Sequence, residues 1–75
     1  MKHKIAILGY GTIGKGVFQI ANSKNDIEIK YVFDRKENFN QDYLNLFTDN
    51  LDDILNDKDV ETVVDEILRR IEVLK

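Results

Sequence analysis

Hydrophobic and polar residues recur with different periods along the chain, and the changes of period mark the expected elements. Ile5–Leu8 is a continuous apolar run that ends at Gly9. Such a run is typical of a strand buried on both faces, as in the centre of a parallel sheet. From Thr12 to about Asn22 the apolar residues recur at helical spacing, which predicts a helix. Gly16 is expected to face the sheet and to allow close packing of that helix. The other residues expected on its buried face are Ile13, Val17, Ile20 and Ala21.

A second strand is predicted between Ile27 and Asp34, where β-branched and aromatic residues alternate with other residues along the chain. Its two faces would hold Ile27, Ile29, Tyr31 and Phe33 on one side, and Glu28, Lys30, Val32 and Asp34 on the other. A short third strand is expected within residues 44–48. A short helix should follow, with Asn50 as its N-cap. The apolar stripe of that helix would be Leu51, Ile54 and Leu55.

The segment 60–74 fits two patterns. Val60–Val64 has the composition of a buried strand. The same segment also carries an unbroken helical stripe, formed by Val60, Val63, Val64, Ile67, Leu68, Ile71 and Leu74. Periodicity favours the helix. The preceding strand–helix–strand order favours a further parallel strand, because such units need repetition to bury their faces. Either way, the order of elements predicts an α/β fold with a parallel sheet.

The glycines give this fold a candidate site. Gly9, Gly11 and Gly14 have the spacing G-x-G-x-x-G, at the point where the first strand gives way to the helix. In that context the spacing is the fingerprint of a dinucleotide-binding loop. The first glycine allows a tight turn, the second lets a pyrophosphate approach the backbone, and the third lets the helix pack on the strand. The N–H groups of Thr12 and Ile13 can bond phosphate oxygens at the positive end of the helix dipole.

An acidic residue, Asp34, follows the glycine motif by about 20 positions at the end of the second strand, where the fingerprint requires one. A carboxylate there accepts hydrogen bonds from ribose hydroxyls, which favours NAD over NADP. Arg35 and Lys36 come next, and a guanidinium could instead hold the 2′-phosphate of NADP. The alternative is a glycine turn without a ligand. The residues predicted to bind the cofactor are Gly9, Gly11, Thr12, Ile13, Gly14, Asp34 and Arg35.

Composition narrows the classes of function. The 75 residues can form one domain, 1–75, and the absence of cysteine with a single histidine, His3, argues against a thiolate or His-rich metal site. A net charge of -3 gives no basic field for nucleic acid. No apolar run approaches the roughly 20 residues of a membrane span, and the run before Gly9 is too short for a signal peptide. A cytoplasmic location is expected.

Aspartates are frequent in the second half of the chain, but they lack the regular alternation and the glycine of an EF-hand loop. Helix capping and a solvent-facing helix surface explain them better than calcium, so no metal site is predicted. The aspartates concerned are Asp49, Asp52, Asp53, Asp57 and Asp59.

The stretch KIAILGYGTIGKGVFQI, residues 4–20, resembles the start of homoserine dehydrogenases, whose glycine loop typically reads G-x-G-T-[VI]-G-x-G-V. The threonine after the second glycine and the second G-x-G step make this likeness narrower than a general dinucleotide-binding match. The stretch LFTDNLDDILNDKDVETVVD, residues 46–65, is similar to the next part of that family. The resemblance thus covers about residues 3–65. Aspartate dehydrogenases and the glucose–fructose oxidoreductase group share much of the pattern.

The resemblance implies a partial Rossmann-type parallel sheet, the first half of an NAD(P)-binding domain. The family interconverts aspartate semialdehyde and homoserine in threonine and methionine biosynthesis. The loop Gly9–Gly14 would hold the pyrophosphate and Asp34 the ribose. The family's catalytic domain lies downstream of this region and is absent here, so the chain alone should carry no catalytic residue and be inactive. One departure is visible: where the family usually has a glycine pair, this chain continues from Asp65 into Glu66.

Two other classes of function remain open. One is a stand-alone nucleotide-binding module that never had a catalytic domain. The other is a protein-interaction domain that uses the apolar stripe of residues 60–74, whose oligomers would dissociate when Ile67 or Ile71 becomes polar. In each case an uncovered stripe or sheet edge leads us to expect a homo-oligomer.

Overall fold

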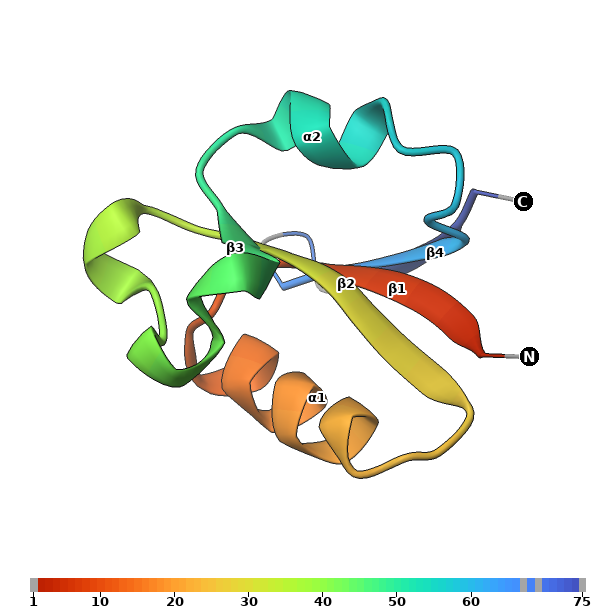
Figure 1. Cartoon of the computed structure of the whole chain (residues 1–75), viewed down its shortest axis with the longest axis horizontal. Coiled ribbons are helices and arrows are strands. Elements are labelled where there is room, and N and C mark those ends of the chain that lie inside the picture. The colour runs from red at the N-terminus through yellow and green to blue at the C-terminus, as the bar shows by residue number, and fades with distance from the viewer. Residues whose placement is uncertain (1, 67, 69, 75) are drawn as a thin grey trace.

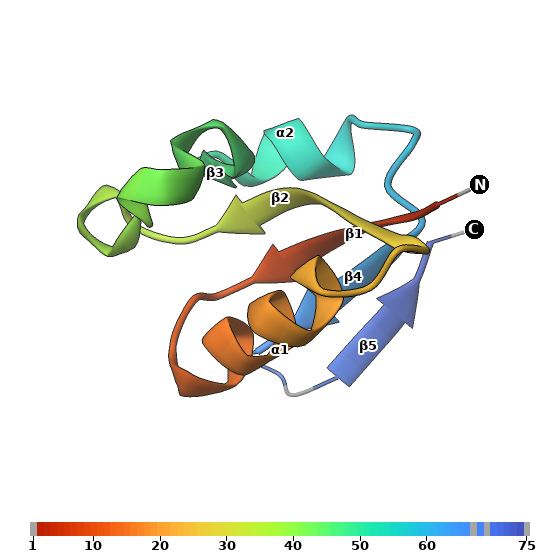
Figure 2. The same ribbon diagram turned by 60° about the horizontal axis from the view of Figure 1, so that its bottom comes forward.

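A five-stranded sheet forms the centre of the computed structural model, which describes residues 2–66, 68 and 70–74. The strands are β1 (His3–Leu8), β2 (Ile27–Phe33), β3 (Phe47–Thr48), β4 (Thr62–Asp65) and β5 (Arg70–Val73). Their order across the sheet is β3-β2-β1-β4-β5. The first four strands are parallel, and β5 runs antiparallel to β4 at one edge (Figure 2). The fold is therefore α/β with a mostly parallel sheet, as the order of elements predicted.

Helices cover both faces of the sheet. They are α1 (Thr12–Asn22) and α2 (Leu51–Leu55), with two 3₁₀ helices between β2 and β3, η1 (Lys36–Asn38) and η2 (Gln41–Leu46). Helix α1 lies on one face and α2 on the other (Figure 1). After β1 the chain continues to β2, which lies on one side of β1. After β4 it continues to β5, which lies on the opposite side of the sheet. The carboxyl ends of β1 and β4 therefore flank a topological switch point, the place where open α/β sheets form a crevice.

Each face of the sheet has its own hydrophobic core. Under α1, η1 and η2 the buried residues are Ile5, Ile7, Phe18, Ala21, Ile29, Val32 and Phe47. Under α2 they are Ala6, Ile54, Val60 and Val63. The residues of β1 alternate between these two cores, so both of its faces are buried, as the apolar run Ile5–Leu8 predicted.

The buried face of α1 differs from the predicted one. Its buried residues are Gly14, Phe18 and Ala21. Ile13 and Ile20, which were expected to be buried, are 45% and 64% exposed. Gly16 does not face the sheet either, because a Cβ built there meets no described atom within 4 Å. The reason is Phe18: an aromatic ring buries a large area, and its packing against Tyr10 and Phe47 sets the rotation of the helix.

Strand β2 also departs from the prediction, because its alternation is interrupted. Ile5 pairs with Ile29 and Ala6 pairs with Tyr31, which leaves Lys30 without a partner on β1. One extra residue reverses the faces beyond it. Ile29 and Val32 consequently share the core under α1, whereas Tyr31 and Phe33 pack with the core under α2. The expectation that Ile27, Ile29, Tyr31 and Phe33 share one face is therefore wrong.

Within the segment 60–74 the structure has two strands, Thr62–Asp65 and Arg70–Val73, so the helical interpretation is wrong for the described residues. Strand β4 pairs with β1 from Ile5↔Thr62 to Leu8↔Asp65, and β5 closes a hairpin on its other side. A helix here would leave the second edge of β1 without hydrogen-bonding partners. Ile67, part of the predicted stripe, lies outside the described residues. A short strand within residues 44–48 is confirmed by β3, and the Asn50 side chain caps α2 by accepting from Asp52 N–H at 3.0 Å. The predicted apolar stripe of α2 is wrong in part, because Ile54 is buried whereas Leu51 and Leu55 are 37% and 64% exposed.

Within the described residues, no helix has both the length and the apolar character needed to cross a membrane.

Candidate functional site

The glycine loop between β1 and α1 lies at the switch point. Gly9 has φ +105°, a left-handed conformation that side chains rarely adopt, and its N–H donates to the carbonyl of Phe33 at 2.8 Å. Gly14 approaches this turn so closely that a Cβ there would lie 2.8 Å from the carbonyl carbon of Gly9. The tight turn at Gly9 and the close packing at Gly14 therefore have the geometry that the spacing predicted.

The side chain of Glu66 fills the hollow inside this loop. Its Oε2 accepts a hydrogen bond from Gly11 N–H at 2.8 Å. A Cβ built on Gly9 or on Gly14 would lie 2.7 or 2.9 Å from the same oxygen, and one built on Gly11 would meet Oε1. Three glycines thus converge on a single carboxylate. The loop holds an anionic oxygen in the space that a dinucleotide fingerprint gives to the pyrophosphate.

The backbone fixes where this carboxylate starts. Glu66 directly follows β4, and its N–H donates to the carbonyl of Leu8 at 2.9 Å, so its backbone extends the pairing of β4 with β1. Across the crevice, helix α1 begins after Gly11, and its first turn contains no acidic residue. Glu66 supplies the negative charge that the helix dipole favours there. Sequence reasoning did not place Glu66 in the site, and its one signal was that the family which the chain resembles usually has a glycine pair at this point.

Asp34 connects the glycine loop to the end of β2. Its Oδ2 accepts from Tyr10 N–H at 2.7 Å, while Oδ1 accepts from Arg35 N–H at 2.6 Å and from Asn38 Nδ2 at 2.8 Å. Burial by itself raises the pKa of Asp34, but the hydrogen bonds from Asn38, Arg35 and Tyr10 outweigh it and hold the pKa below its ordinary value. Asp34 is therefore an anion at neutral pH, and its hydrogen bonds order the two loops that meet there.

A cavity of about 360 Å³ lies beside Asp34, on the α1 face of the loop. Its lining residues are Tyr10, Lys15, Glu37, Asn38, Phe39 and Asn40. Tyr10 forms the floor: its ring packs edge-on against Phe47 at 4.8 Å between centroids, and its hydroxyl accepts from Asn40 Nδ2 at 3.0 Å. The Lys15 ammonium lies 5.6 Å from the centre of the same ring. The lining is mostly polar: it joins the rings of Tyr10 and Phe39 to amide groups and to two side chains of opposite charge, Lys15 and Glu37.

The other predicted residues lie around this centre. Thr12 begins α1 and is exposed, so its N–H belongs to the first turn, where helical N–H groups have no internal acceptor. Ile13 is exposed and lines a groove on the β4 side of the loop together with Glu66 and Ile71. The side chain of Arg35 is 83% exposed, and its guanidinium lies 4.0 Å from Glu37. The structure thus brings together the glycines and Asp34, and leaves Arg35 at the periphery.

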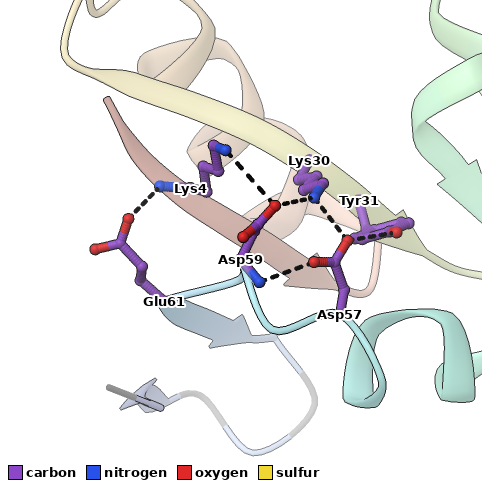
Figure 3. Close-up of polar contacts among 6 residues, drawn as sticks. All are labelled: Lys4, Lys30, Tyr31, Asp57, Asp59 and Glu61. Carbon is purple, nitrogen blue, oxygen red and sulfur yellow. Dashed lines mark hydrogen bonds and ion pairs between the residues drawn. The ribbon is translucent and has the colours of Figure 1, made fainter. Parts of the chain in front are cut away.

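A second polar cluster, which sequence reasoning did not find, lies on the α2 face (Figure 3). Asp57 accepts from Lys30 Nζ at 2.7 Å and from the Tyr31 hydroxyl at 2.8 Å. Lys30 also reaches Asp59 at 3.3 Å. Hydrogen bonds to Asp57 from Lys30, from the Asp59 N–H and from the Tyr31 hydroxyl, the first being the largest cause, lower the pKa of Asp57 to about 2. The explanation of these aspartates by helix capping and a solvent-facing surface therefore misses the ion pairs of Asp57 and Asp59, although the Asp59 side chain is 63% exposed, as expected.

This cluster fastens the loop between α2 and β4 to the sheet. Consecutive residues of a regular strand point to opposite faces, so the irregularity of β2 at Lys30 is what allows Lys30 and Tyr31 to reach the same carboxylate. A hollow of about 420 Å³ lies here, larger than the cavity beside Asp34. Three of its carboxylates, those of Asp53, Asp57 and Asp59, already bond to the chain itself. The described residues contain no group of three or more side chains that could hold a metal ion.

Comparisons of the chain with protein-family models, with curated protein sequences and with solved structures found no match. The function proposed for the chain consequently depends on its own residues and contacts.

Proposed function

We propose that the chain binds a nicotinamide dinucleotide through the loop Gly9–Gly14, as part of a Rossmann-type cofactor domain of an oxidoreductase similar to homoserine dehydrogenases. The pyrophosphate would take the place of the Glu66 carboxylate at Gly11 N–H. The adenosine end would lie toward Asp34 and the cavity lined by Tyr10 and Asn38. The nicotinamide ring, when bound, supplies the hydride chemistry, and the residues of this chain bind and orient the other end of the cofactor.

The observation that carries the proposal is the carboxylate at the glycine loop. Gly11 N–H donates to an anionic oxygen at 2.8 Å, inside a hollow that the lack of three side chains keeps open. The hollow lies at the N-terminus of an eleven-residue helix, beyond the carboxyl end of β1, where open α/β sheets bind their ligands. The donors and the space therefore suit a phosphate oxygen, provided that Glu66 withdraws.

Titration calorimetry with NAD tests this assignment. We expect Gly11→Val to weaken NAD binding by at least about tenfold, because the side chain occupies the hollow that the phosphate needs. Gly16→Ala is the matched control in the same helix, since a Cβ there meets no described atom within 4 Å, and it should leave the affinity unchanged. Circular dichroism verifies that both variants are folded. Equal affinity of wild type and Gly11→Val would overturn the fingerprint interpretation.

The same site should also determine whether NAD or NADP binds more tightly. Asp34 is an anion at neutral pH, and a 2′-phosphate beside it would bring two negative charges together. We expect NAD to bind more tightly than NADP, and Asp34→Asn, which keeps the shape of the side chain, to narrow the difference. A wild-type preference for NADP, measured by the same titration, would show that Arg35 and Lys36 outweigh Asp34.

A second candidate function is protein interaction, and the exposure of β5 favours it. All four residues of β5 are exposed, and the strand forms an edge of the sheet. An open edge with apolar side chains invites pairing with another chain. This function needs no ligand in the glycine loop, so a chain that binds no dinucleotide but self-associates through β5 would support it.

A further inference from the structure

We propose that Glu66 sets the affinity of the glycine loop for a dinucleotide, because its carboxylate holds the pyrophosphate position until the ligand displaces it. This inference rests on the proposed function and concerns the same site. Glu66 acts as an internal competitor of the ligand phosphate for the Gly11 N–H. The competition arises from three features: the place of the carboxylate, its charge, and the freedom of its side chain.

The place of the carboxylate leaves no room for a second anion. Glu66 Oε2 is bonded to Gly11 N–H, and the same oxygen would lie within 3 Å of a Cβ at Gly9 or Gly14. A ligand phosphate that used Gly11 N–H would have to occupy this volume. The two groups cannot share the loop, so binding of the phosphate requires the carboxylate to leave.

Charge strengthens the exclusion. A carboxylate and a pyrophosphate are both anions, and they repel each other at contact distance. The donor at Gly11 and the positive end of α1 stabilise whichever anion is present. The carboxylate therefore takes the favourable interaction that the ligand would otherwise gain. The apparent affinity for the ligand equals the affinity of the free loop multiplied by the fraction of molecules whose loop is free.

Release of the carboxylate needs only a side-chain rotation. The backbone of Glu66 is held by its N–H bond to Leu8, while the side chain crosses the crevice to Gly11. Glu66 also lines the groove of about 230 Å³ between α1 and β5, beside Arg70 and Ile71. This groove is open space into which the side chain can turn without any change in the sheet. The loop can thus alternate between a closed and a free state within one backbone conformation.

Calorimetric titration with NAD and, separately, with inorganic pyrophosphate tests the proposal on wild type, Glu66→Ala and Glu66→Gln. We expect Glu66→Ala to bind NAD about tenfold more tightly, which corresponds to a wild-type loop that is free about one tenth of the time. Glu66→Gln should lie between the two, since it keeps the length and loses the charge. Glu28→Ala is the control: this exposed glutamate lies at the start of β2, away from the loop, and its removal should not change the affinity.

Hydrogen exchange provides a readout that needs no ligand. In Glu66→Ala the Gly11 amide loses its acceptor, so it should exchange faster than in wild type, whereas amides in the centre of β1 should not. Unchanged exchange at Gly11 would show that the contact is not formed in solution and would overturn the inference.

The titrations separate failure of this inference from failure of the proposed function. If wild type and Glu66→Ala bind NAD equally well, the dinucleotide site stands and the competition is refuted. If neither binds NAD but Glu66→Ala binds pyrophosphate and wild type does not, Glu66 does exclude an anion, and the dinucleotide assignment is refuted. If no variant binds either ligand, both are refuted.

Discussion

Gly14 and Gly16 lie two positions apart in α1, yet only the first needs to be glycine. At Gly14 the helix touches the turn at Gly9, and an added Cβ would collide with backbone atoms that have no room to move. At Gly16 an added Cβ meets no described atom within 4 Å. A glycine within a helix is less stable than alanine by roughly 0.5–1 kcal/mol, because the unfolded chain loses more freedom on folding.

We therefore expect the same substitution, glycine to alanine, to change the free energy of unfolding in opposite directions at these two positions. Gly16→Ala should raise the free energy of unfolding by roughly 0.5–1 kcal/mol, and Gly14→Ala should lower it by about 1–3 kcal/mol, the usual cost of overpacking. Urea denaturation at neutral pH measures both. A loss of stability in Gly16→Ala would mean that another surface packs on this side of α1, which is the side where Ile13 and Ile20 are exposed.

Among the elements, strand β2 can bind the loop before β4 because its pairing with β1 is irregular at Lys30. The extra residue at Lys30 turns two neighbouring side chains toward Asp57, and this ties β2 to the loop before β4. Strand β4 in turn carries Glu66 to the glycine loop at its other end. The cluster around Asp57 is therefore distant from the candidate site but helps to hold the strand that positions it.

The contribution of Asp57 should depend on pH in a defined window. Its pKa is lowered from 3.8 to about 2, so it stabilises the fold above pH 3.8 and loses this effect as the pH falls from 3.8 to about 2. Asp57→Asn should unfold at lower urea concentration than wild type at pH 7, and the difference should shrink through this window. Asp49→Asn is the control, because the ion pair of Asp49 with Lys36, at 3.9 Å, is exposed and contributes little. A constant difference from pH 7 to 2.5 would contradict the ion pair.

At the scale of the whole molecule, the β5 side of the sheet carries uncovered apolar surface on both faces. The exposed apolar residues of this region are Ile13, Ile20, Leu55, Leu68, Ile71, Val73 and Leu74. They surround an edge strand whose outward backbone groups have no strand beside them among the described residues. Surfaces of this kind mark interaction sites or association between copies.

We expect the chain to self-associate in a concentration-dependent manner through β5. Ile71→Lys should shift the equilibrium toward monomer, because it puts a charge at a side chain that is 67% exposed on the edge strand. Leu44→Lys replaces an exposed leucine in η2, near the opposite edge of the sheet, and should not change association. Sedimentation equilibrium measures all three proteins. A wild-type monomer at every concentration, or equal effects of the two lysines, would contradict a role for β5.

The sequence by itself determined the features that depend on neighbouring residues. The apolar run before Gly9, the period change at Thr12 and the Asn50 cap are local signals, and each led to the correct element. The turn at Gly9 follows from glycine spacing for the same reason, since a positive φ is a property of one residue.

Tertiary structure decided what depends on residues far apart in the chain. The rotation of α1 is set by Phe18 packing on Phe47, which periodicity within the helix cannot reveal. The choice of strand for residues 62–65 depends on the free edge of β1, because strands gain their hydrogen bonds only from a neighbour. The contact between Glu66 and Gly11 spans 55 positions. Only the sheet, which places the ends of β1 and β4 side by side, brings that carboxylate into the glycine loop.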